Sequence, residues 1–281
     1  MLCMKTVVLL NCHEIRCPKV LMYVFIEMCG AFKDKVIIAD SVHEIHNDCI
    51  VFMGNGFQHS DPVSLLYSIA PHAIYIGWYW QNINTSLLKF IHTYENMLNP
   101  NAQVKLCQQQ KIHCPLYLRA SEHPNSIGTY PRTNQHDYCY MGWKYCPELV
   151  PYSFKGIYHG VLNHDYFLPY AKRKEIYLSS TFALGFQSEE NIENKHVSQR
   201  IFEGLAYGCI VLSNSIPACE QTNHIVVYIE SRADVENKMK YFMNHPNILR
   251  KKQEEGYAFI KKCGTNHYSI HEFLKRINKL N

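Results

Sequence analysis

The sequence predicts an α/β protein made of two domains, each built on a parallel β-sheet that helices cover on both faces. Two observations lead to this prediction. Short aliphatic or aromatic runs alternate with segments of helical spacing along most of the chain, which is the pattern of strand–helix–strand units. The chain has 281 residues, of which 47% are hydrophobic, so it is globular in composition and long enough for two domains of ordinary size.

In the N-terminal part, four β-branched or aromatic runs are expected to be strands. They are Lys5–Leu10, Lys35–Ala39, Cys49–Met53 and Ala73–Trp78. The segments with helical spacing are Pro18–Gly30, Asp61–Ala70 and Thr85–Leu98. Asp61 followed by Pro62 is a typical helix start, with an N-cap and a proline in the first turn. We expect this first domain to cover residues 1–120.

A polar segment separates this domain from the next one. Residues 119–136 show no periodicity and contain Pro124, Gly128 and Pro131, which are residues that interrupt regular structure. We therefore expect a linker at residues 121–136.

The alternation resumes after the linker and indicates a second domain at residues 137–266, followed by a closing helix at 267–281. The expected strands are Asp137–Trp143, Phe154–His159, Glu175–Ser179, Cys209–Ser213 and His224–Ile229. The expected helices are Val197–Tyr207, Asp234–Asn244, Pro246–Lys262 and Tyr268–Lys279. In open parallel sheets ligands bind at the carboxyl ends of the strands. Two such domains facing each other make a cleft at their junction, and we expect the chemistry there.

The net charge of +4 is concentrated near the C-terminus. Residues 232–281 hold 11 Lys/Arg against 5 Asp/Glu, which leaves 17 basic and 19 acidic residues in 1–231. Solvated helix faces account for such an excess, although a basic segment could also favour an anionic partner. The overall balance argues against a nucleic-acid partner, because such proteins need many cationic contacts with phosphates.

The sequence contains no run that is apolar enough for a signal-peptide core or a membrane span. The run Val7–Leu10 is too short, and the run Val20–Cys29 is broken by Glu27. The twelve cysteines include no Cys-x-x-Cys pair, and no His-Glu-x-x-His motif is present. We interpret the cysteines as reduced, mostly buried thiols of a cytoplasmic protein.

Residues 196–214 contain the strongest functional signal. In the helix expected there, Arg200 and Glu203 lie three residues apart on one face, and Gly208 ends the helix directly before an apolar strand. A guanidinium can bind phosphate oxygens with two hydrogen bonds, and a carboxylate can accept from both hydroxyls of a ribose, so the pair suits a nucleoside diphosphate. From the spacing alone, an ordinary intrahelical ion pair on a solvated face remains an alternative.

The sequence Arg-Ile-Phe-Glu-Gly-Leu-Ala-Tyr-Gly at 200–208, followed by Cys-Ile-Val-Leu-Ser at 209–213, resembles the C-terminal signature of group 1 glycosyltransferases of the GT-B fold. The similarity extends over roughly residues 137–280 and is most specific at 196–214, whereas residues 1–118 share only the strand–helix alternation. The resemblance implies two Rossmann-like domains that face each other and a C-terminal helix that crosses back to the first domain.

The resemblance also implies roles for individual residues. Glu203 would bind the ribose of a sugar nucleotide, and Arg200 would face its diphosphate. Ser198, His196 and Lys195 stand at the helix start, where backbone N–H groups favour anions, and are further candidates for donor binding. Many retaining members have a second acidic residue at the position of Lys195, so its absence favours an inverting reaction. The proline that usually follows the helix-ending glycine is also missing.

A second element of the same resemblance lies in residues 137–144. The strand expected there runs into Gly142 and looks like the first strand of the second domain, whose glycine turn approaches the donor phosphates in that family. Gly142 and Lys144 are therefore candidate phosphate contacts, while an ordinary surface role for the lysine stays open.

The sequence has no Asp-x-Asp motif, which many glycosyltransferases of the other main fold use to hold a divalent metal. We therefore expect no metal or other cofactor, so cations and helix N-termini must stabilise the leaving diphosphate. Inverting transfer also needs a base for the acceptor hydroxyl. His13, His59 and Asp61 follow expected strands and are the candidate bases, and Trp78 and Trp80 are candidates for stacking on an acceptor sugar. Structural roles in capping and core packing are the alternative for all five.

Together these features predict a transferase that moves a hexose or pentose from a nucleotide diphosphate, with a UDP-sugar favoured and UDP-xylose considered, to an oligosaccharide or glycoprotein. The compact, cysteine-rich character is similar to that of small glycosyltransferases of large DNA viruses of algae, which implies a capsid glycan as substrate and the host cytoplasm as location. A nucleotide-sugar epimerase and a non-catalytic module that binds nucleotide or glycan are the alternatives. A dinucleotide-dependent oxidoreductase is disfavoured, because no Gly-x-Gly-x-x-Gly motif follows a strand.

Overall fold

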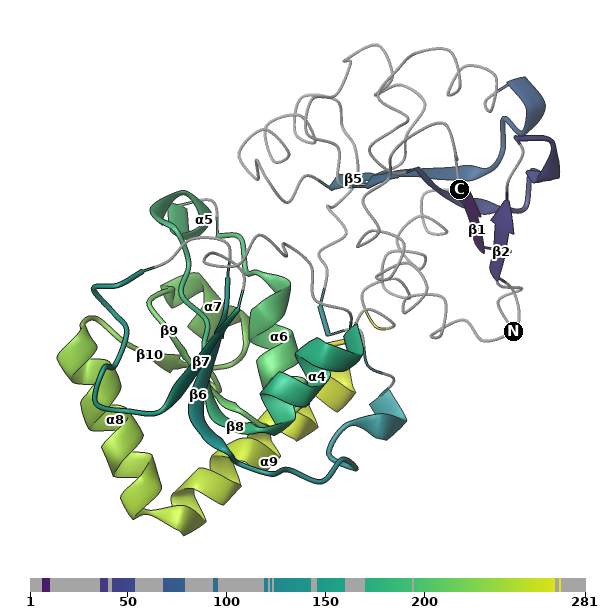
Figure 1. Cartoon of the computed structure of the whole chain (residues 1–281). Coiled ribbons are helices and arrows are strands. Elements are labelled where there is room, and N and C mark those ends of the chain that lie inside the picture. The colour runs from purple at the N-terminus through teal and green to yellow at the C-terminus, as the bar shows by residue number, and fades with distance from the viewer. Residues whose placement is uncertain are drawn as a thin grey trace. The chain divides into compact units, whose positions relative to one another are not determined.

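The chain forms two compact units in the computed structural model shown in Figure 1. The first consists of residues 1–117 and 270–281, and the second of residues 118–269. The structure describes residues 7–10, 36–39, 42–53, 68–78, 93–95, 119–120, 122, 124–142, 146–159, 170–193, 195–265 and 268.

The first unit contains a five-stranded parallel sheet with the strand order β2-β1-β3-β4-β5. Its strands are β1 (Val7–Leu10), β2 (Val36–Ala39), β3 (Ile50–Met53), β4 (Ile74–Trp78) and β5 (Thr93–Glu95), and the short 3-10 helix η1 (Val42–Glu44) precedes β3. The four expected strands are confirmed, each starting one or two residues later than expected. The helix expected at Pro18–Gly30 lies outside the described residues, as does most of the one expected at Asp61–Ala70.

The prediction of a helix at Thr85–Leu98 is wrong where the structure describes that segment. β5 occupies Thr93–Glu95 and pairs in parallel with β4. A β-branched threonine and a tyrosine fit a pleated strand, and pairing with a neighbouring strand outweighs the helical spacing of the apolar residues.

The second unit contains a second five-stranded parallel sheet, with the order β10-β9-β8-β6-β7. Its strands are β6 (His136–Met141), β7 (Gly156–His159), β8 (Ser180–Leu184), β9 (Ile210–Ser213) and β10 (Val227–Tyr228). The helices are η4 (Pro124–Ser126), α4 (Tyr170–Leu178), α5 (Glu189–Glu193), α6 (Gln199–Ala206), α7 (Ile216–Gln221), α8 (Arg232–Asn244) and α9 (Pro246–Cys263). This arrangement confirms the predicted α/β class with parallel sheets in both halves of the chain.

Both sheets have the same strand order. In each, the first strand lies beside the second, and the chain then crosses to the other side of the first strand to place the third, fourth and fifth. A crevice forms at the carboxyl end of such a sheet where the direction of winding reverses. In the second unit this switch point lies between β6 and β8.

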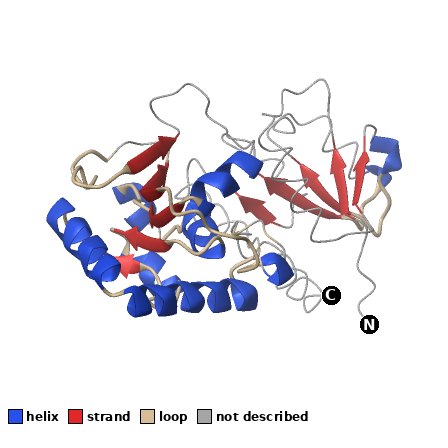
Figure 2. Ribbon diagram, turned by 60° about the horizontal axis from the view of Figure 1, so that its bottom comes forward, coloured by secondary structure: helices blue, strands red, loops and turns tan. Residues whose placement is uncertain are grey.

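Alternate residues of the second sheet point into two separate cores, so the sheet is covered on both faces (Figure 2). The small residues Cys139, Ala183 and Val211 face α4, α6 and α9. The neighbouring Phe182 and Leu212 face α8 and the loop before β7. Because the strand residues on the first face are small, α6 can lie close to the strand ends.

The strand expected at Glu175–Ser179 is the last part of α4, and this prediction is wrong. Ile176 and Tyr177 are buried while the preceding part of α4 is largely exposed, which is the one-sided burial of a helix on a sheet. The hydroxyls of Ser179 and Ser180 both donate to the carbonyl of Ile176, at 3.0 and 2.8 Å, and so satisfy a carbonyl at the helix end. The strand β8 begins only at Ser180.

The segment expected to be a linker packs into the second unit. Ala120 forms a β-bridge with Thr265, and Ile127 is completely buried in the core below α6 and α9. Pro124 and Gly128, on which the linker prediction rests, shape a 3-10 turn and the bend after it.

The two-residue strand β10 is at the edge of the second sheet among the described strands. Lys238 of α8 lies beside it. Its ammonium donates to the carbonyl of Tyr228 and pairs with Asp234 at 2.9 Å. The carbonyl of Tyr228 on this edge strand therefore has a partner within the unit.

The 18-residue helix α9 buries only Gly256, Phe259 and Ile260. Leu249, Tyr257 and Cys263 are partly buried against the two cores, and most of its other residues are polar. No helix in the part of the chain that the structure describes is both long and apolar enough to cross a bilayer.

The end of α6 is closed by Gly208. Its φ of +76° lies in the left-handed region, and its N–H donates to the carbonyl of Leu205 at 3.1 Å. A Cβ at this position would overlap the ring and hydroxyl of Tyr257. The glycine therefore lets the chain turn directly from α6 into β9, as the sequence predicts.

We expect Gly208→Ala to lower the free energy of unfolding by about 2–4 kcal/mol. A left-handed alanine costs about 1–2 kcal/mol, and the overlap with Tyr257 adds about 1–3 kcal/mol. Gly128→Ala is a matched control, because Gly128 also has a φ of +76° but its added Cβ would be 3.4 Å from the nearest ring atom. Urea unfolding of both variants measures the difference, and equal losses would contradict the role of Tyr257.

Candidate functional site

Arg200 lies at the switch point of the second sheet. It belongs to the first turn of α6, and its half-buried side chain reaches the end of β6. Nε donates to Oγ of Ser198 at 3.0 Å, and Nη1 donates to the carbonyl of Met141 at 3.2 Å. The guanidinium thereby connects the helix start to the carboxyl end of β6.

Gly142 makes room for this guanidinium. A Cβ on Gly142 would overlap Nη1 of Arg200 and would lie 2.6 Å from the hydroxyl of Tyr140. Burial raises the pKa of that hydroxyl to about 12, against the opposing influence of the Arg200 charge, so Tyr140 remains a protonated donor at neutral pH. The structure therefore brings together two of the predicted donor-binding residues, Arg200 and Gly142.

The start of α6 is left without a side-chain cap. Ser198 is the N-cap residue, but its hydroxyl accepts no hydrogen bond from the first-turn amides. Its Oγ instead accepts from Nε2 of Gln187 at 2.8 Å and from Nε of Arg200. An N-terminus in this state favours an anion, because its amides and the helix dipole point toward it.

Glu203 is the most unusual charged group of the cluster. It is only 3% exposed, and its Oε1 lies 3.5 Å from Nη2 of Arg173 on α4. Burial raises the pKa of the Glu203 carboxyl, the Arg173 guanidinium opposes this effect, and the charge of Glu122 adds to it. A hydrogen bond from the Tyr177 hydroxyl also lowers the pKa of this carboxyl, but among the described residues no donor reaches Oε1 with full hydrogen-bond geometry.

The neighbouring carboxylate of Glu122 is fully paired by comparison. Its Oε1 accepts from Nζ of Lys174 and from the hydroxyl of Tyr207, both at 3.0 Å, and its Oε2 accepts from the hydroxyl of Tyr130 at 3.1 Å. The two buried carboxylates therefore differ in how completely their oxygens are hydrogen-bonded. Glu122 has the hydrogen bonds of a structural ion pair, whereas Glu203 keeps capacity for further donors.

His196 and Lys195 were expected to supply positive charge beside the diphosphate. His196 is buried, and burial, together with the nearby Arg200 charge, lowers its pKa to about 4. It is therefore neutral near pH 7 in this arrangement, and its role in donor binding stays a prediction. Lys195 is exposed and has a φ of +54°, and within the described residues no contact joins its ammonium to Arg200.

Most of the remaining candidates lie outside the described residues, so their roles stay predictions. They are Lys144, His13, His59, Asp61 and Trp80. Trp78 is the last residue of β4, of which the structure describes the backbone.

Sequence reasoning missed Gln187, Asn214 and Arg173. Gln187 and Asn214 follow the ends of β8 and β9, and the two residues bind each other through side-chain and backbone groups. Polar residues within three positions after a buried strand are a detectable signal. Because a strand was expected at Glu175–Ser179 and not at β8, Gln187 was not recognised as following a strand. Nothing local in the sequence indicates that Arg173 pairs with Glu203.

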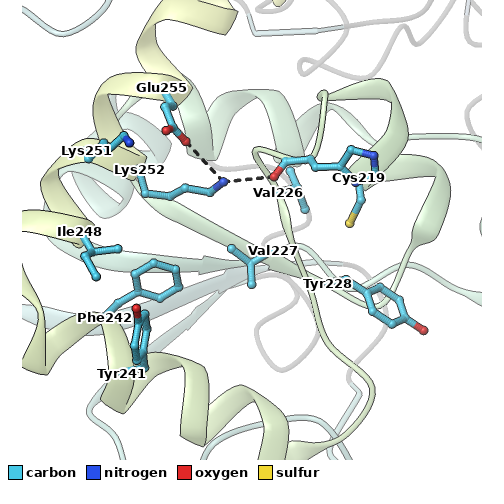
Figure 3. A pocket seen from close by; sticks show the side chains of 11 residues that line it. Cys219, Val226, Val227, Tyr228, Tyr241, Phe242, Ile248, Lys251, Lys252 and Glu255 are labelled. Carbon is cyan, nitrogen blue, oxygen red and sulfur yellow. Dashed lines mark hydrogen bonds and ion pairs between the residues drawn. The ribbon is translucent and has the colours of Figure 1, made fainter.

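A pocket of about 510 Å³ lies apart from this cluster, between β10, α8 and α9 (Figure 3). Lys252 lies on its wall, where its ammonium contacts the carbonyl of His224 at 3.1 Å and Oε2 of Glu255 at 3.5 Å. This cation is therefore already paired within the protein. In the described part of the chain, no group of three His, Cys, Asp or Glu side chains is arranged to hold a metal ion.

Solved structures of glycosyltransferases have a similar fold. An alpha-glucosyltransferase bound to UDP is 10% identical with a TM-score of 0.66, and the T4 phage enzyme BGT bound to UDP-glucose is 12% identical with a TM-score of 0.57; both alignments cover 97% of this chain and 99% of the other. Anabaena Alr3699/HepE bound to UDP is 9% identical with a TM-score of 0.52, covering 98% of this chain and 100% of the other. At these identities the likeness concerns the fold.

Two further neighbours were solved with a nucleic acid or with a metal ion. The alpha-glucosyltransferase was also solved with UDP and a 13-mer DNA, and T4 phage BGT with UDP and Mn²⁺.

No curated protein sequence matches the chain. The sequence profile of the glycosyl transferase-like family matches residues 131–275, which is more than half of the 281 residues and includes Arg173, Arg200 and Glu203. The chain belongs to this glycosyl transferase-like family.

Proposed function

We propose that the protein transfers a sugar from a UDP-sugar to a hydroxyl of an oligosaccharide or glycoprotein. The observation that carries the proposal is the position of Arg200. It lies at the switch point of a parallel sheet, beside an uncapped helix start and one helical turn from a buried carboxylate with unused hydrogen-bonding capacity. The UDP in two structural neighbours and the UDP-glucose in a third support the choice of nucleotide.

In this proposal the carboxylate of Glu203 binds the ribose. A diol brings two O–H donors, and among the described residues no donor reaches Oε1 of Glu203 with full hydrogen-bond geometry. A buried carboxylate without its full set of donors costs stability on the order of 1–3 kcal/mol. A ligand that supplies donors removes this cost, which favours binding.

Arg200 and the start of α6 bind the diphosphate. During transfer, the bond between the anomeric carbon and the diphosphate oxygen breaks, and the acceptor oxygen forms the new bond to that carbon. The diphosphate leaves with additional negative charge, which a guanidinium and a helix N-terminus stabilise more strongly in the transition state than in the bound substrate. The acceptor proton passes to a base of the first unit, for which His13, His59 and Asp61 are the candidates.

Fewer observations bear on the acceptor than on the nucleotide donor. A carbohydrate is favoured by the tryptophans at and after the end of β4, Trp78 and Trp80, and by the net charge of −2 in residues 1–231. Because the alpha-glucosyltransferase was solved with DNA, an acceptor screen should contain hydroxymethylated DNA beside oligosaccharides and glycoproteins. The donor panel should include UDP-glucose and UDP-xylose.

We expect Glu203→Ala and Arg200→Ala to weaken UDP binding by about 10- to 100-fold each. A hydrogen bond to a charged group contributes about 1.5–3 kcal/mol, which corresponds to this range. Glu255→Ala and Arg232→Ala remove charges of the same kind from α9 and α8, outside the cluster, and should leave the affinity unchanged. Isothermal titration of UDP into all four folded variants measures these affinities. Unchanged affinity in Glu203→Ala and Arg200→Ala would show that these two residues are not part of the donor site.

We expect the advantage of the wild-type protein over Glu203→Gln in UDP affinity to shrink in acid. Burial raises the pKa of Glu203 above the ordinary value of about 4.3, so the carboxylate gains a proton, and loses acceptor capacity, at a higher pH than an exposed glutamate. Titrations of UDP from pH 8 to pH 4.5 measure the ratio of the two affinities. The titration of UDP itself affects both proteins equally, and a ratio that does not change with pH would contradict the assignment.

We expect sugar transfer to proceed without a divalent metal. Arg200 and the start of α6 supply the positive charge that a metal would bring to the diphosphate. The measurement is product formation from UDP-sugars and an acceptor, with EDTA and then with added Mn²⁺. Loss of transfer in EDTA with recovery in Mn²⁺ would contradict this expectation, and conversion of the donor without an acceptor would instead indicate an epimerase.

A further inference from the structure

Gln187 occupies a central position in the polar network at the ends of the second sheet. It lies between β8 and α5 and is only 2% exposed. Its backbone N–H donates to Oδ1 of Asn214 at 2.8 Å, and its carbonyl accepts from Nδ2 of the same asparagine at 3.1 Å. This double contact fixes the backbone of Gln187 against the end of β9.

The side-chain amide of Gln187 is fixed at both ends as well. Oε1 accepts from Nδ2 of Asn191 at 3.2 Å, and Nε2 donates to Oγ of Ser198 at 2.8 Å. The contact with Asn191 sets which end of the amide carries the donor. The N–H donor of Gln187 therefore points at the hydroxyl of Ser198.

Ser198 connects the side-chain amide of Gln187 to the guanidinium of Arg200. A hydroxyl oxygen has two acceptor positions, and those of Ser198 are used by Nε2 of Gln187 and by Nε of Arg200. With both positions occupied, the serine does not cap its own helix. The same contacts thus hold the guanidinium at the end of β6 and keep the start of α6 open.

We propose that Gln187 is a positioning residue for donor binding: through Ser198 it orients the Arg200 guanidinium for the diphosphate of the nucleotide sugar. This inference rests on the function proposed above. Gln187 contacts Arg200 only through the serine, so its contribution should depend on Arg200 and on the presence of phosphates in the ligand. A purely structural role would affect every ligand of the site equally.

The experiment compares UDP with uridine, which lacks the phosphates. We expect Gln187→Ala to weaken UDP binding by about 3- to 10-fold and to leave uridine binding unchanged. Adding Gln187→Ala to Arg200→Ala should cause no further loss of UDP affinity, because the group it positions is already absent. Titrations of UDP and uridine into the three full-length variants measure these effects. Thr222→Val, which removes a buried hydroxyl directly after α7, serves as a control that should alter neither affinity.

Each outcome separates the inference from the proposed function. Equal weakening of UDP and uridine by Gln187→Ala, or a full additional loss in the double variant, would overturn the positioning role. A loss with Arg200→Ala but none with Gln187→Ala would do the same while leaving the proposed function intact. Unchanged UDP affinity with Arg200→Ala would reject the proposed function itself.

If Gln187→Ala does not fold, Ser198→Ala tests the same connection, because it removes the oxygen that joins the glutamine to the guanidinium. We expect the same loss for UDP and none for uridine. Equal losses for both ligands would overturn the proposal.

Discussion

The contact between the Arg200 guanidinium and the carbonyl of Met141 is the interaction on which the arrangement of this site depends. It joins α6 to the end of β6, at the point where the winding of the sheet reverses. A half-buried guanidinium requires acceptors, and here they are a strand-end carbonyl and the hydroxyl of Ser198. Gly142 is small enough to let the guanidinium reach that carbonyl, and the serine no longer caps its helix.

The second constraint is the burial of charge beside α4. Glu122 and Glu203 are both nearly inaccessible to water, yet only Glu122 has a complete set of donors. A protein selected for stability alone would satisfy both carboxylates or replace one of them. An incompletely satisfied carboxylate, one turn from an arginine at a strand end, is the type of local compromise that functional sites require.

The parts that could be predicted from the sequence are those with strong local signals. Gly208 and the apolar strand after it located α6 and β9 almost to the residue, because a left-handed glycine and a buried strand leave clear patterns. The segments that were assigned wrongly, Glu175–Ser179 and Thr93–Glu95, are short runs in which strand and helix share the same residue types, and the neighbouring chain decides between them.

The candidate site shows the same contrast between local sequence signals, which could be predicted, and contacts between distant residues, which could not. Arg200 and Glu203 are three residues apart in the sequence and form a recognisable motif. Their partners are distant in the sequence: Arg173 lies 30 residues before Glu203, and Met141 lies 59 residues before Arg200. Whether a guanidinium pairs with a carboxylate or with a carbonyl depends on packing that no short pattern encodes.

The brevity of β10 has a consequence for how the protein behaves in concentrated solution. A long, flat outer strand offers a row of unpaired amides and carbonyls on which another polypeptide can assemble. Here the outermost described strand has two residues, and the ammonium of Lys238 occupies the carbonyl of Tyr228. Growth of the sheet from one molecule into the next is thereby discouraged at this margin, where a lysine occupies an acceptor that another strand would need.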